Sequence, residues 1–227
     1  MTVDGLRYEN KYFISRAAYV QLKTRIAAGL DTDSHALDSG GCYHIRSLYF
    51  DDCHQSGLLD KVDGVEKREK FRIRLYNGDD SFIRLESKQK LGQMTRKLSA
   101  PLTREQTERL LRGDTWWMWD SEHELIRNFY LKLRTRLLRP AVIVDYDREP
   151  YVFEDVRITF DKDLRGGVHR YDLFDNGLFT VAAMPSDRLI LEVKYDEQLP
   201  YMVKKLLGTV PMARSAISKY EWCRRQQ

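Results

Sequence analysis

The feature that most constrains the fold is an alternating stretch at residues 68–76, REKFRIRLY. Phe71, Ile73 and Leu75 occupy alternate positions, so they fall on the same face of an extended strand. The opposite face carries four cations at the same period of two: Arg68, Lys70, Arg72 and Arg74. The turn sequence NGDD follows, and residues 81–90 then read as the returning strand of a hairpin. The chain is therefore expected to contain an antiparallel sheet with one apolar face and one cationic face.

The rest of the sequence predicts strands before and after a helical middle. Further strands are expected at residues 8–14, 42–50, 94–99, 141–147, 156–161 and 189–195. Two groups of strands separated by helices favour a mostly antiparallel α+β fold over a doubly wound parallel sheet.

Capping boxes predict the helices in the middle of the chain. Thr103 with Gln106, and Ser121 with Glu124, have the spacing in which each side chain caps the other's backbone. The helix after Ser121 is expected to pack one apolar stripe against the sheet: Leu125, Phe129, Leu133 and Leu137. Further helices are expected after Ser15 and before Gly208.

Length and composition limit the class of protein. With 227 residues the chain can bury a substantial core, and we expect residues 1–227 to form a single domain. The net charge is only +4, so the placement of the cations matters more than their number. The three cysteines show no disulfide or metal spacing, the N-terminal sequence MTVDGLRYEN has no signal-peptide pattern, and no apolar run could cross a bilayer. We therefore expect a cytoplasmic protein without direct membrane insertion, whose link to a membrane would need a membrane-protein partner of unknown identity.

The cationic faces of the strands have two interpretations. An antiparallel sheet commonly exposes one face to water, and Lys, Arg and Glu are ordinary residues on such a face. However, four like charges along one face repel one another unless an anion lies beside them, and the planar guanidinium of arginine suits phosphate oxygens. If the sheet closes with its charged face inward, it forms a basic tunnel that can hold a run of phosphates.

Three Glu-x-Lys spacings add carboxylates to these faces, at Glu9, Glu86 and Glu192. Mg²⁺ or Mn²⁺ is usually held by one or two carboxylates together with substrate phosphates, so these glutamates are candidate ligands for either ion. The alternative role is pairing with neighbouring lysines and arginines, and the two roles are compatible.

Seven short motifs follow one another along most of the chain. In order they are RYENKYFIS, SLYFDD, REKFRIRLYN, RLESKQK, YDREPY with VRITFD, LILEVKY and SKYEW. Together they resemble the VTC domain, a polyphosphate polymerase module of the triphosphate tunnel metalloenzyme (CYTH-like) superfamily. The resemblance implies an antiparallel β-barrel tunnel with flanking helices, whose lumen binds triphosphate or polyphosphate with a divalent metal. Larger eukaryotic members add a phosphate-sensing domain and membrane helices, which this sequence lacks, so a stand-alone bacterial-type member is expected.

The resemblance also implies roles for individual residues. Those expected to hold phosphates during catalysis are Lys11, Arg72, Arg74, Lys88, Arg148, Arg157, Lys194 and Lys219. Additional substrate-binding residues are Lys61, Lys70, Lys97 and Ser218. The implied metal ligands are Glu192 first, then Glu86 and Glu9.

Other conspicuous side chains are interpreted as structural or surface groups. The histidines show no paired ligand spacing: His35, His44, His54, His123 and His169. The tryptophans of the WWMW sequence at residues 116–119 are expected in packing or an interface, with stacking on a nucleobase as the alternative. Direct nucleic-acid binding is not expected, because the RRM and OB signatures are lacking. The commonest alternative enzymes are also not expected, because the sequence has no P-loop, Ser-His-Asp order or Gly-rich dinucleotide fingerprint.

The function expected from the sequence is a metal-dependent phosphotransferase. It would transfer the terminal phosphoryl group of a nucleoside triphosphate to a growing polyphosphate chain, and ATP is the expected donor. Two alternatives remain open: hydrolysis of tripolyphosphate or nucleoside triphosphate by an aligned water, and polyphosphate binding without turnover. No residue in the sequence decides between the acceptors, although the three glutamates favour catalysis over binding alone.

Overall fold

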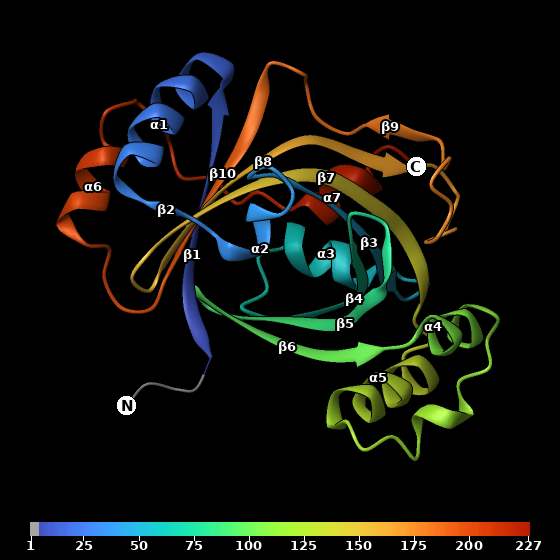
Figure 1. The fold of residues 1–227 in the computed structure, drawn as a ribbon. Coiled ribbons are helices and arrows are strands. Elements are labelled where there is room, and N and C mark those ends of the chain that lie inside the picture. The colour runs from blue at the N-terminus through green and yellow to red at the C-terminus, as the bar shows by residue number, and fades with distance from the viewer. Residues whose placement is uncertain (1–4) are drawn as a thin grey trace.

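Eight long strands close into an antiparallel barrel in the computed structural model, which describes residues 5–227 (Figure 1). Their order around the ring is β7-β3-β4-β5-β6-β1-β10-β8, and β8 pairs with β7 to close it. The strands of the ring are β1 (Leu6–Ser15), β3 (Tyr43–Asp51), β4 (Lys67–Tyr76), β5 (Asp79–Leu91), β6 (Met94–Leu102), β7 (Arg139–Phe153), β8 (Val156–Gly167) and β10 (Arg188–Tyr195). Two short strands extend the sheet beyond the ring, β2 (Asp31–Thr32) on β7 and β9 (Thr180–Ala182) on β8.

The β4–β5 hairpin sets which side chains face the lumen. Asn77 and Gly78 both have positive φ angles, 53° and 71°, the conformation of the tight turn that Asn-Gly favours. The register pairs Arg72 with Glu86, and the side chains of both residues line the interior. The apolar residues between the β4 cations are buried on the outer face, as the alternation predicted.

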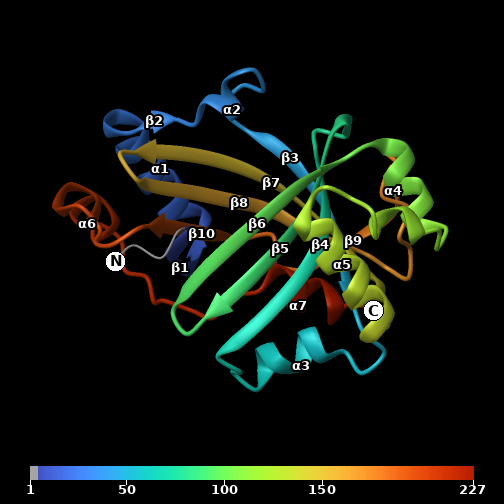
Figure 2. The same ribbon diagram turned by 90° about the horizontal axis from the view of Figure 1, so that it is seen from below.

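Helices cover the outer face of the barrel on two opposite sides (Figures 1 and 2). On one side, α1 (Arg16–Gly29) and α6 (Tyr201–Leu207) pack with the apolar outer residues of β1, β8 and β10. On the other, α4 (Arg104–Leu111), the 3-10 turn η1 (Trp116–Met118) and α5 (Glu124–Thr135) cover β3, β4, β5 and β6. The apolar faces of the strands are thus buried between the ring and the helices, and the polar faces point into the barrel.

A third apolar cluster fills part of the interior. The helix α7 (Lys219–Arg224) brings Tyr220 and Cys223 against inward-facing residues of β3, β7, β8 and β10. The short helices α2 (Ser34–Leu37) and α3 (Ser56–Val62) complete the fold. No helix within residues 5–227 combines the length and the apolar character that a bilayer crossing requires.

Most of the helix ends predicted from the sequence are confirmed. Ser15 caps α1 by accepting a hydrogen bond from the N–H of Ala18. Thr103 and Gln106 form the complete capping box of α4, and Gly208 is the C-cap of α6. These caps satisfy backbone groups that a helix end leaves free.

Two predictions about α5 are wrong. Ser121 does not cap this helix, because its Oγ accepts a hydrogen bond from the N–H of His123, which precedes the first helical residue Glu124. The N-cap is His123 instead. Leu137 does not extend the apolar stripe, since α5 ends at Thr135 and Leu137 is 55% exposed, with a φ angle of 52°.

Candidate functional site

The barrel encloses a cavity of about 1220 Å³ to which all eight strands of the ring contribute side chains. From Arg68 to Tyr76 the cavity follows β4 over roughly 26 Å, at a strand rise of about 3.3 Å per residue. The two ends of the β4–β5 hairpin therefore lie at opposite ends of the cavity. Every site residue predicted from the sequence lines it: Glu9, Lys11, Lys61, Lys70, Arg72, Arg74, Glu86, Lys88, Lys97, Arg148, Arg157, Glu192, Lys194, Ser218 and Lys219.

Positive charge is concentrated in this cavity. Among the described residues, its lining carries 17 lysines and arginines but only four aspartates and glutamates. Of the 38 basic and 34 acidic side chains of the chain, 21 basic and 29 acidic ones lie elsewhere within residues 5–227. The small net charge of the chain thus hides a basic interior and an acidic remainder, and such a separation directs anions into the cavity.

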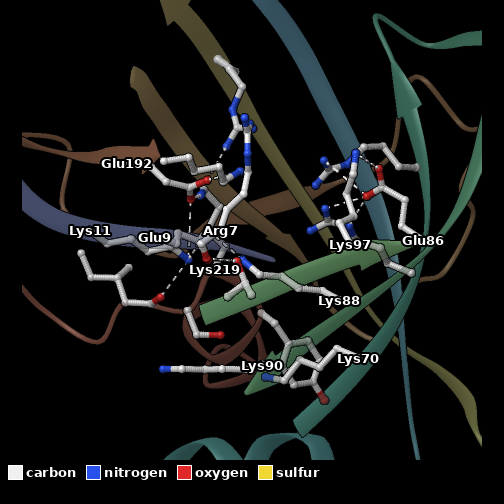
Figure 3. A pocket seen from close by; sticks show the side chains of 18 of the residues that line it. Arg7, Glu9, Lys11, Lys70, Glu86, Lys88, Lys90, Lys97, Glu192 and Lys219 are labelled. Atoms are coloured by element: carbon white, nitrogen blue, oxygen red, sulfur yellow. Dashed lines mark hydrogen bonds and ion pairs between the residues drawn. The ribbon is translucent and has the colours of Figure 1, made fainter. Parts of the chain in front are cut away.

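One cluster of charges surrounds Glu86 (Figure 3). Its carboxylate accepts hydrogen bonds from Arg72 Nε at 2.7 Å and Lys97 Nζ at 3.1 Å, and Arg74 Nη1 lies 3.6 Å away. Burial alone would raise the pKa of Glu86, but the three cations hold it well below its usual value. Glu86 is therefore ionised, and it fixes the two arginines side by side on β4.

Tyrosines and a serine position the same two arginines. Arg72 Nη1 donates to the hydroxyl of Tyr49 at 2.7 Å. Arg74 donates to Ser47 Oγ at 3.0 Å and to the Tyr146 hydroxyl at 3.2 Å. Because several groups restrain each guanidinium, little side-chain entropy remains to be lost when an anion binds.

A second cluster is built on Asp161, a residue of β8 that is 1% exposed. Its carboxylate accepts from Arg148 Nε at 2.7 Å and Nη2 at 2.8 Å, and it pairs with Lys219 Nζ at 2.5 Å. Lys219 also lies 3.5 Å from Glu192, so α7 and β10 meet through this cation. Burial would lower the pKa of Lys219, but Asp161 and Glu192 raise it, so the ammonium stays charged.

Glu9 and Glu192 form a pair of neighbouring carboxylates (Figure 3). Both lie near the same ammonium, with Lys11 Nζ 3.5 Å from Glu9 Oε1 and 3.6 Å from Glu192 Oε2. Lys88 Nζ is 2.8 Å from Glu9 Oε1, and Lys194 Nζ is 2.7 Å from Glu192 Oε1. Burial and Glu192 tend to raise the pKa of Glu9, but these cations lower it to about 2. The lysine pairing predicted for both glutamates is therefore present.

The chemistry of this carboxylate pair fits a divalent cation that shares its ligands with phosphate. Within residues 5–227, no cluster of three or more His, Cys, Asp or Glu side chains could hold a metal by itself. Glu86 lies across the cavity from Glu9 and Glu192 (Figure 3), so the three predicted ligands do not converge on one point. Two carboxylates plus substrate oxygens are nevertheless the usual donor set for Mg²⁺.

The remaining predicted residues extend the basic lining. Lys61 pairs with Glu221 at 2.7 Å, and Arg157 donates to the Tyr43 hydroxyl at 3.0 Å. Ser218 caps α7 by accepting a hydrogen bond from the N–H of Glu221, which leaves its O–H able to donate into the cavity. Lys70 lies 4.4 Å from the centre of the Tyr220 ring, and burial together with nearby Arg68 lowers its pKa to about 7.

Sequence reasoning missed several residues of the cavity. Arg84 shares the inner face of β5 with Glu86 and Lys88, and the period of two would have found it. Asp161 gave no signal, because its partners on β7 and α7 meet it only when the barrel closes. Other basic lining residues not assigned from the sequence are Arg7, Arg68, Lys90, Arg96 and Arg214.

The tryptophans and most histidines lie away from the cavity. Trp116 and Trp119 are 70% and 50% exposed beside Tyr130 on the outer face, which fits an interface or packing role and not stacking in the tunnel. His44 pairs with Asp147 at 3.0 Å, a structural contact. His35 is the exception among the five histidines, because it lines the cavity.

Comparisons with known proteins agree with this architecture. The family model described as "VTC domain" matches residues 6–226. A search of curated proteins found no match. One similar solved structure is that of a "putative adenylyl cyclase" from Hippeastrum, which is described as having a dominant triphosphatase activity. It is 13% identical to this chain and superposes with a TM-score of 0.56, and the match covers 98% of this chain and 96% of that chain. A conserved hypothetical protein from Pyrococcus furiosus is 10% identical with a TM-score of 0.51, covering 95% and 99%. Identities this low show a shared fold alone.

Proposed function

Because the chain belongs to the VTC domain family and has the triphosphate tunnel fold, we propose that it is a metal-dependent phosphotransferase acting on nucleoside triphosphate and polyphosphate. In its preferred reaction it transfers the terminal phosphoryl group of ATP to the end of a polyphosphate chain. The observation that carries the proposal is the cavity inside the closed barrel, whose lining within residues 5–227 has 17 cations against four carboxylates. A cavity of this charge suits a ligand that is itself a run of negative charges.

The transfer requires positioning and charge neutralisation. An oxygen of the acceptor phosphate attacks the terminal phosphorus, the bond from that phosphorus to its bridging oxygen breaks, and nucleoside diphosphate leaves with the bonding electrons. Arg72, Arg74 and Arg148 hold the non-bridging oxygens, where negative charge is spread in the transition state. Their counter-charges, Glu86 and Asp161, keep the guanidiniums in place before substrate arrives. No side-chain nucleophile is needed.

Glu9 and Glu192 are the residues proposed to hold Mg²⁺ or Mn²⁺ beside the phosphates. When bound, the ion neutralises charge on neighbouring phosphate oxygens. Lys11, Lys194 and Lys219 already surround these carboxylates, so they remain beside the ion to contact substrate oxygens.

Hydrolysis is the second candidate function, because the same arrangement with water as the acceptor gives a triphosphatase. The structurally similar Hippeastrum protein, with its dominant triphosphatase activity, supports this candidate. The experiment that separates the candidates is incubation of the purified protein with labelled ATP or tripolyphosphate and Mg²⁺ or Mn²⁺, followed by separation of products by length. Longer chains identify a polymerase, free phosphate identifies a hydrolase, and retained but unchanged ligand identifies a binding protein.

Two variants test the assignment of the residues. Arg72→Ala with Arg74→Ala is expected to weaken ATP binding by about tenfold or more, because two charged hydrogen-bond donors are lost. Glu192→Gln is expected to lower turnover by about tenfold or more with a smaller effect on binding, because a metal ligand acts mainly on the transition state. The matched control is Arg25→Ala with Arg134→Ala, two exposed arginines outside the cavity. Unchanged binding and turnover in both cavity variants would contradict the assignment.

A further inference from the structure

One end of the basic cavity carries an aromatic wall. Phe82 lies on the inner face of β5, at the end of the alternating series that continues through Arg84, Glu86 and Lys88. Its side chain is an apolar member of an otherwise charged series, and it is 47% exposed. An open aromatic ring beside cations offers a flat apolar face that the ring of a ligand can cover.

Two tyrosines continue this wall toward the interior. The ring centroids of Phe82 and Tyr76 are 5.8 Å apart, and those of Tyr76 and Tyr43 are also 5.8 Å apart. Tyr43 is buried and Tyr76 is half-buried, whereas Phe82 is open to solvent. The three rings therefore form a continuous aromatic surface, whose exposure to solvent decreases from Phe82 through Tyr76 to Tyr43.

Arginines join this wall to the phosphate-binding part of the cavity. The guanidinium of Arg84 lies 4.3 Å from the Phe82 ring centre, and that of Arg74 lies 5.9 Å from the Tyr76 ring centre. Arg157 contacts the Tyr43 hydroxyl. A ligand with a flat ring followed by phosphates thus meets an aromatic face first and guanidiniums directly behind it.

The opposite end of the cavity has a different character. Arg68 and Lys90 face each other across the β4–β5 ladder there, and Lys61 of α3 also lines the cavity. The aromatic ring near this part of the cavity, Tyr220, is only 2% exposed and lies beneath Lys70. Within the described part of the chain this end therefore offers cations and no open ring, which suits a ligand made of phosphates alone.

We propose that the exposed Phe82 and its neighbour Tyr76 bind the nucleobase of the nucleoside triphosphate, with the phosphates directed inward past Arg74 and Arg84. The polyphosphate chain then occupies the opposite end, beside Arg68 and Lys90. This assignment rests on the proposed function, and it adds an orientation of the substrate that the phosphate contacts do not define. Because stacking needs only a flat ring, the subsite is expected to accept more than one base.

The test compares two ligands that share a triphosphate but differ in the base. Dissociation constants for ATP and for inorganic tripolyphosphate are measured by calorimetry with the wild-type protein, Phe82→Ala, Phe82→Leu and Phe82→Tyr. The leucine variant keeps an apolar side chain without an aromatic face, and the tyrosine variant keeps the ring. Phe179→Ala is the matched control, because Phe179 is 73% exposed and lies outside the cavity lining.

The expected result is a selective loss of ATP binding. Phe82→Ala and Phe82→Leu should raise the ratio of the ATP to the tripolyphosphate dissociation constant by about fivefold or more, given the usual strength of base stacking on an aromatic ring. Phe82→Tyr and Phe179→Ala should leave the ratio at the wild-type value. An unchanged ratio in the alanine and leucine variants would overturn the nucleobase subsite and leave the proposed function standing. If the wild-type protein bound neither ligand, the proposed function would fall, and this inference with it.

Discussion

At the scale of single residues, Lys70 is a cation of the cavity that forms no ion pair within 4 Å among residues 5–227, and the charges of Asp51 and Glu221 act on it only from farther away. Burial is the largest cause of its lowered pKa of about 7, and the charge of Arg68 adds to it. In the free protein at neutral pH, Lys70 is therefore only partly charged. An anion placed beside it raises its pKa, so binding of phosphate is accompanied by uptake of a proton.

This proton uptake predicts a pH dependence of binding. Below about pH 7, Lys70 is already protonated and contributes its full attraction, whereas above that pH each bound anion must also recruit a proton. The advantage of the wild-type protein over Lys70→Met in tripolyphosphate affinity should therefore shrink as the pH rises through 7, by at most about tenfold per pH unit. Calorimetric titrations of both proteins across this range measure the ratio, in which the ionisation of the ligand cancels.

The control for the pH profile is Lys205→Met, which removes an exposed lysine on α6. It should reproduce the wild-type profile at every pH. A ratio of wild-type to Lys70→Met affinity that stays constant with pH would contradict the coupling of Lys70 to the ligand.

Residues of the cavity were predictable where the signal is local. The period of two on β4 and β5 was enough to place Arg72, Arg74, Glu86 and Lys88 on one face, and the structure shows this face inside the barrel. The role of Asp161 was not predictable, because its partners Arg148 and Lys219 lie on other elements and come within contact distance only when the barrel closes. Pattern reasoning therefore reveals which side chains share a face, but not which faces meet.

At the scale of elements, the long strands, the well-capped helices and the short helix α6 before Gly208 were predictable, whereas the other short helices were not. The β4–β5 hairpin has an alternating pattern joined to an Asn-Gly turn, and α4 has a complete capping box, so several local signals agree. The helices α3 and α7 have only seven and six residues. Helices this short are marginal by themselves, so tertiary contacts decide whether they form, even where a local cap such as Ser218 of α7 is present.

The helix α1 is anchored to the barrel through one carboxylate. Glu149 of β7 is 4% exposed and accepts hydrogen bonds from the hydroxyls of Tyr19 and Tyr151, both at 2.6 Å. It also pairs with Lys23 of α1 at 2.7 Å and with Lys162 of β8 at 3.1 Å. Burial would raise the pKa of Glu149, but these partners lower it to about 2. The anchor therefore depends on an ionised carboxylate.

Acid titration tests this anchor. A carboxyl group whose pKa is lower in the folded protein stabilises the fold above its unfolded pKa, and this contribution disappears as the pH falls through the folded value. Glu149→Gln should lower the free energy of unfolding at pH 7 by about 2 kcal/mol. This figure is smaller than the full pKa shift implies, because Lys23 is half-exposed and solvent screens its charge. The difference between the two proteins should vanish as the pH approaches about 2. Urea unfolding from pH 7 to pH 3 measures the trend, with the exposed Glu122→Gln as the control. A difference that does not depend on pH would contradict the role of the charge.

At the scale of the whole molecule, closure of the barrel is what turns charged strand faces into a site. Consecutive strands such as β7 and β8 pair as hairpins, but no sequence pattern marks the pairing of β1 with β6 that completes the ring. Strands β7 and β8 pair over a long ladder, whereas β1 and β6 share only the pairs from Leu6 with Arg96 to Tyr8 with Met94. The ion pair between Lys88 of β5 and Glu9 of β1 crosses this short seam. The predicted inward closure is therefore confirmed, but the pairing of β1 with β6 that completes it was not predictable from the sequence.

Closure also confines like charges, and this gives a prediction for the stability of the molecule. The cations of the lining outnumber its carboxylates so strongly that they repel one another in the free protein. A ligand that binds the folded state alone stabilises it by mass action, about 2.7 kcal/mol at a concentration one hundred times Kd. For a domain of this size, saturating tripolyphosphate should therefore raise Tm by roughly 5 to 10 °C.

The specificity of this thermal shift separates binding in the cavity from general screening of charge. NaCl at matched ionic strength screens the same repulsion only weakly inside a closed barrel, so its effect on Tm should be much smaller. Arg72→Ala with Arg74→Ala should lose most of the shift caused by tripolyphosphate, because these arginines lie at the centre of the cavity lining. Arg25→Ala with Arg134→Ala should keep it, since both arginines are exposed outside the cavity. Equal shifts from NaCl and tripolyphosphate would show that the cavity does not select a phosphate chain, because screening alone would then explain the stabilisation.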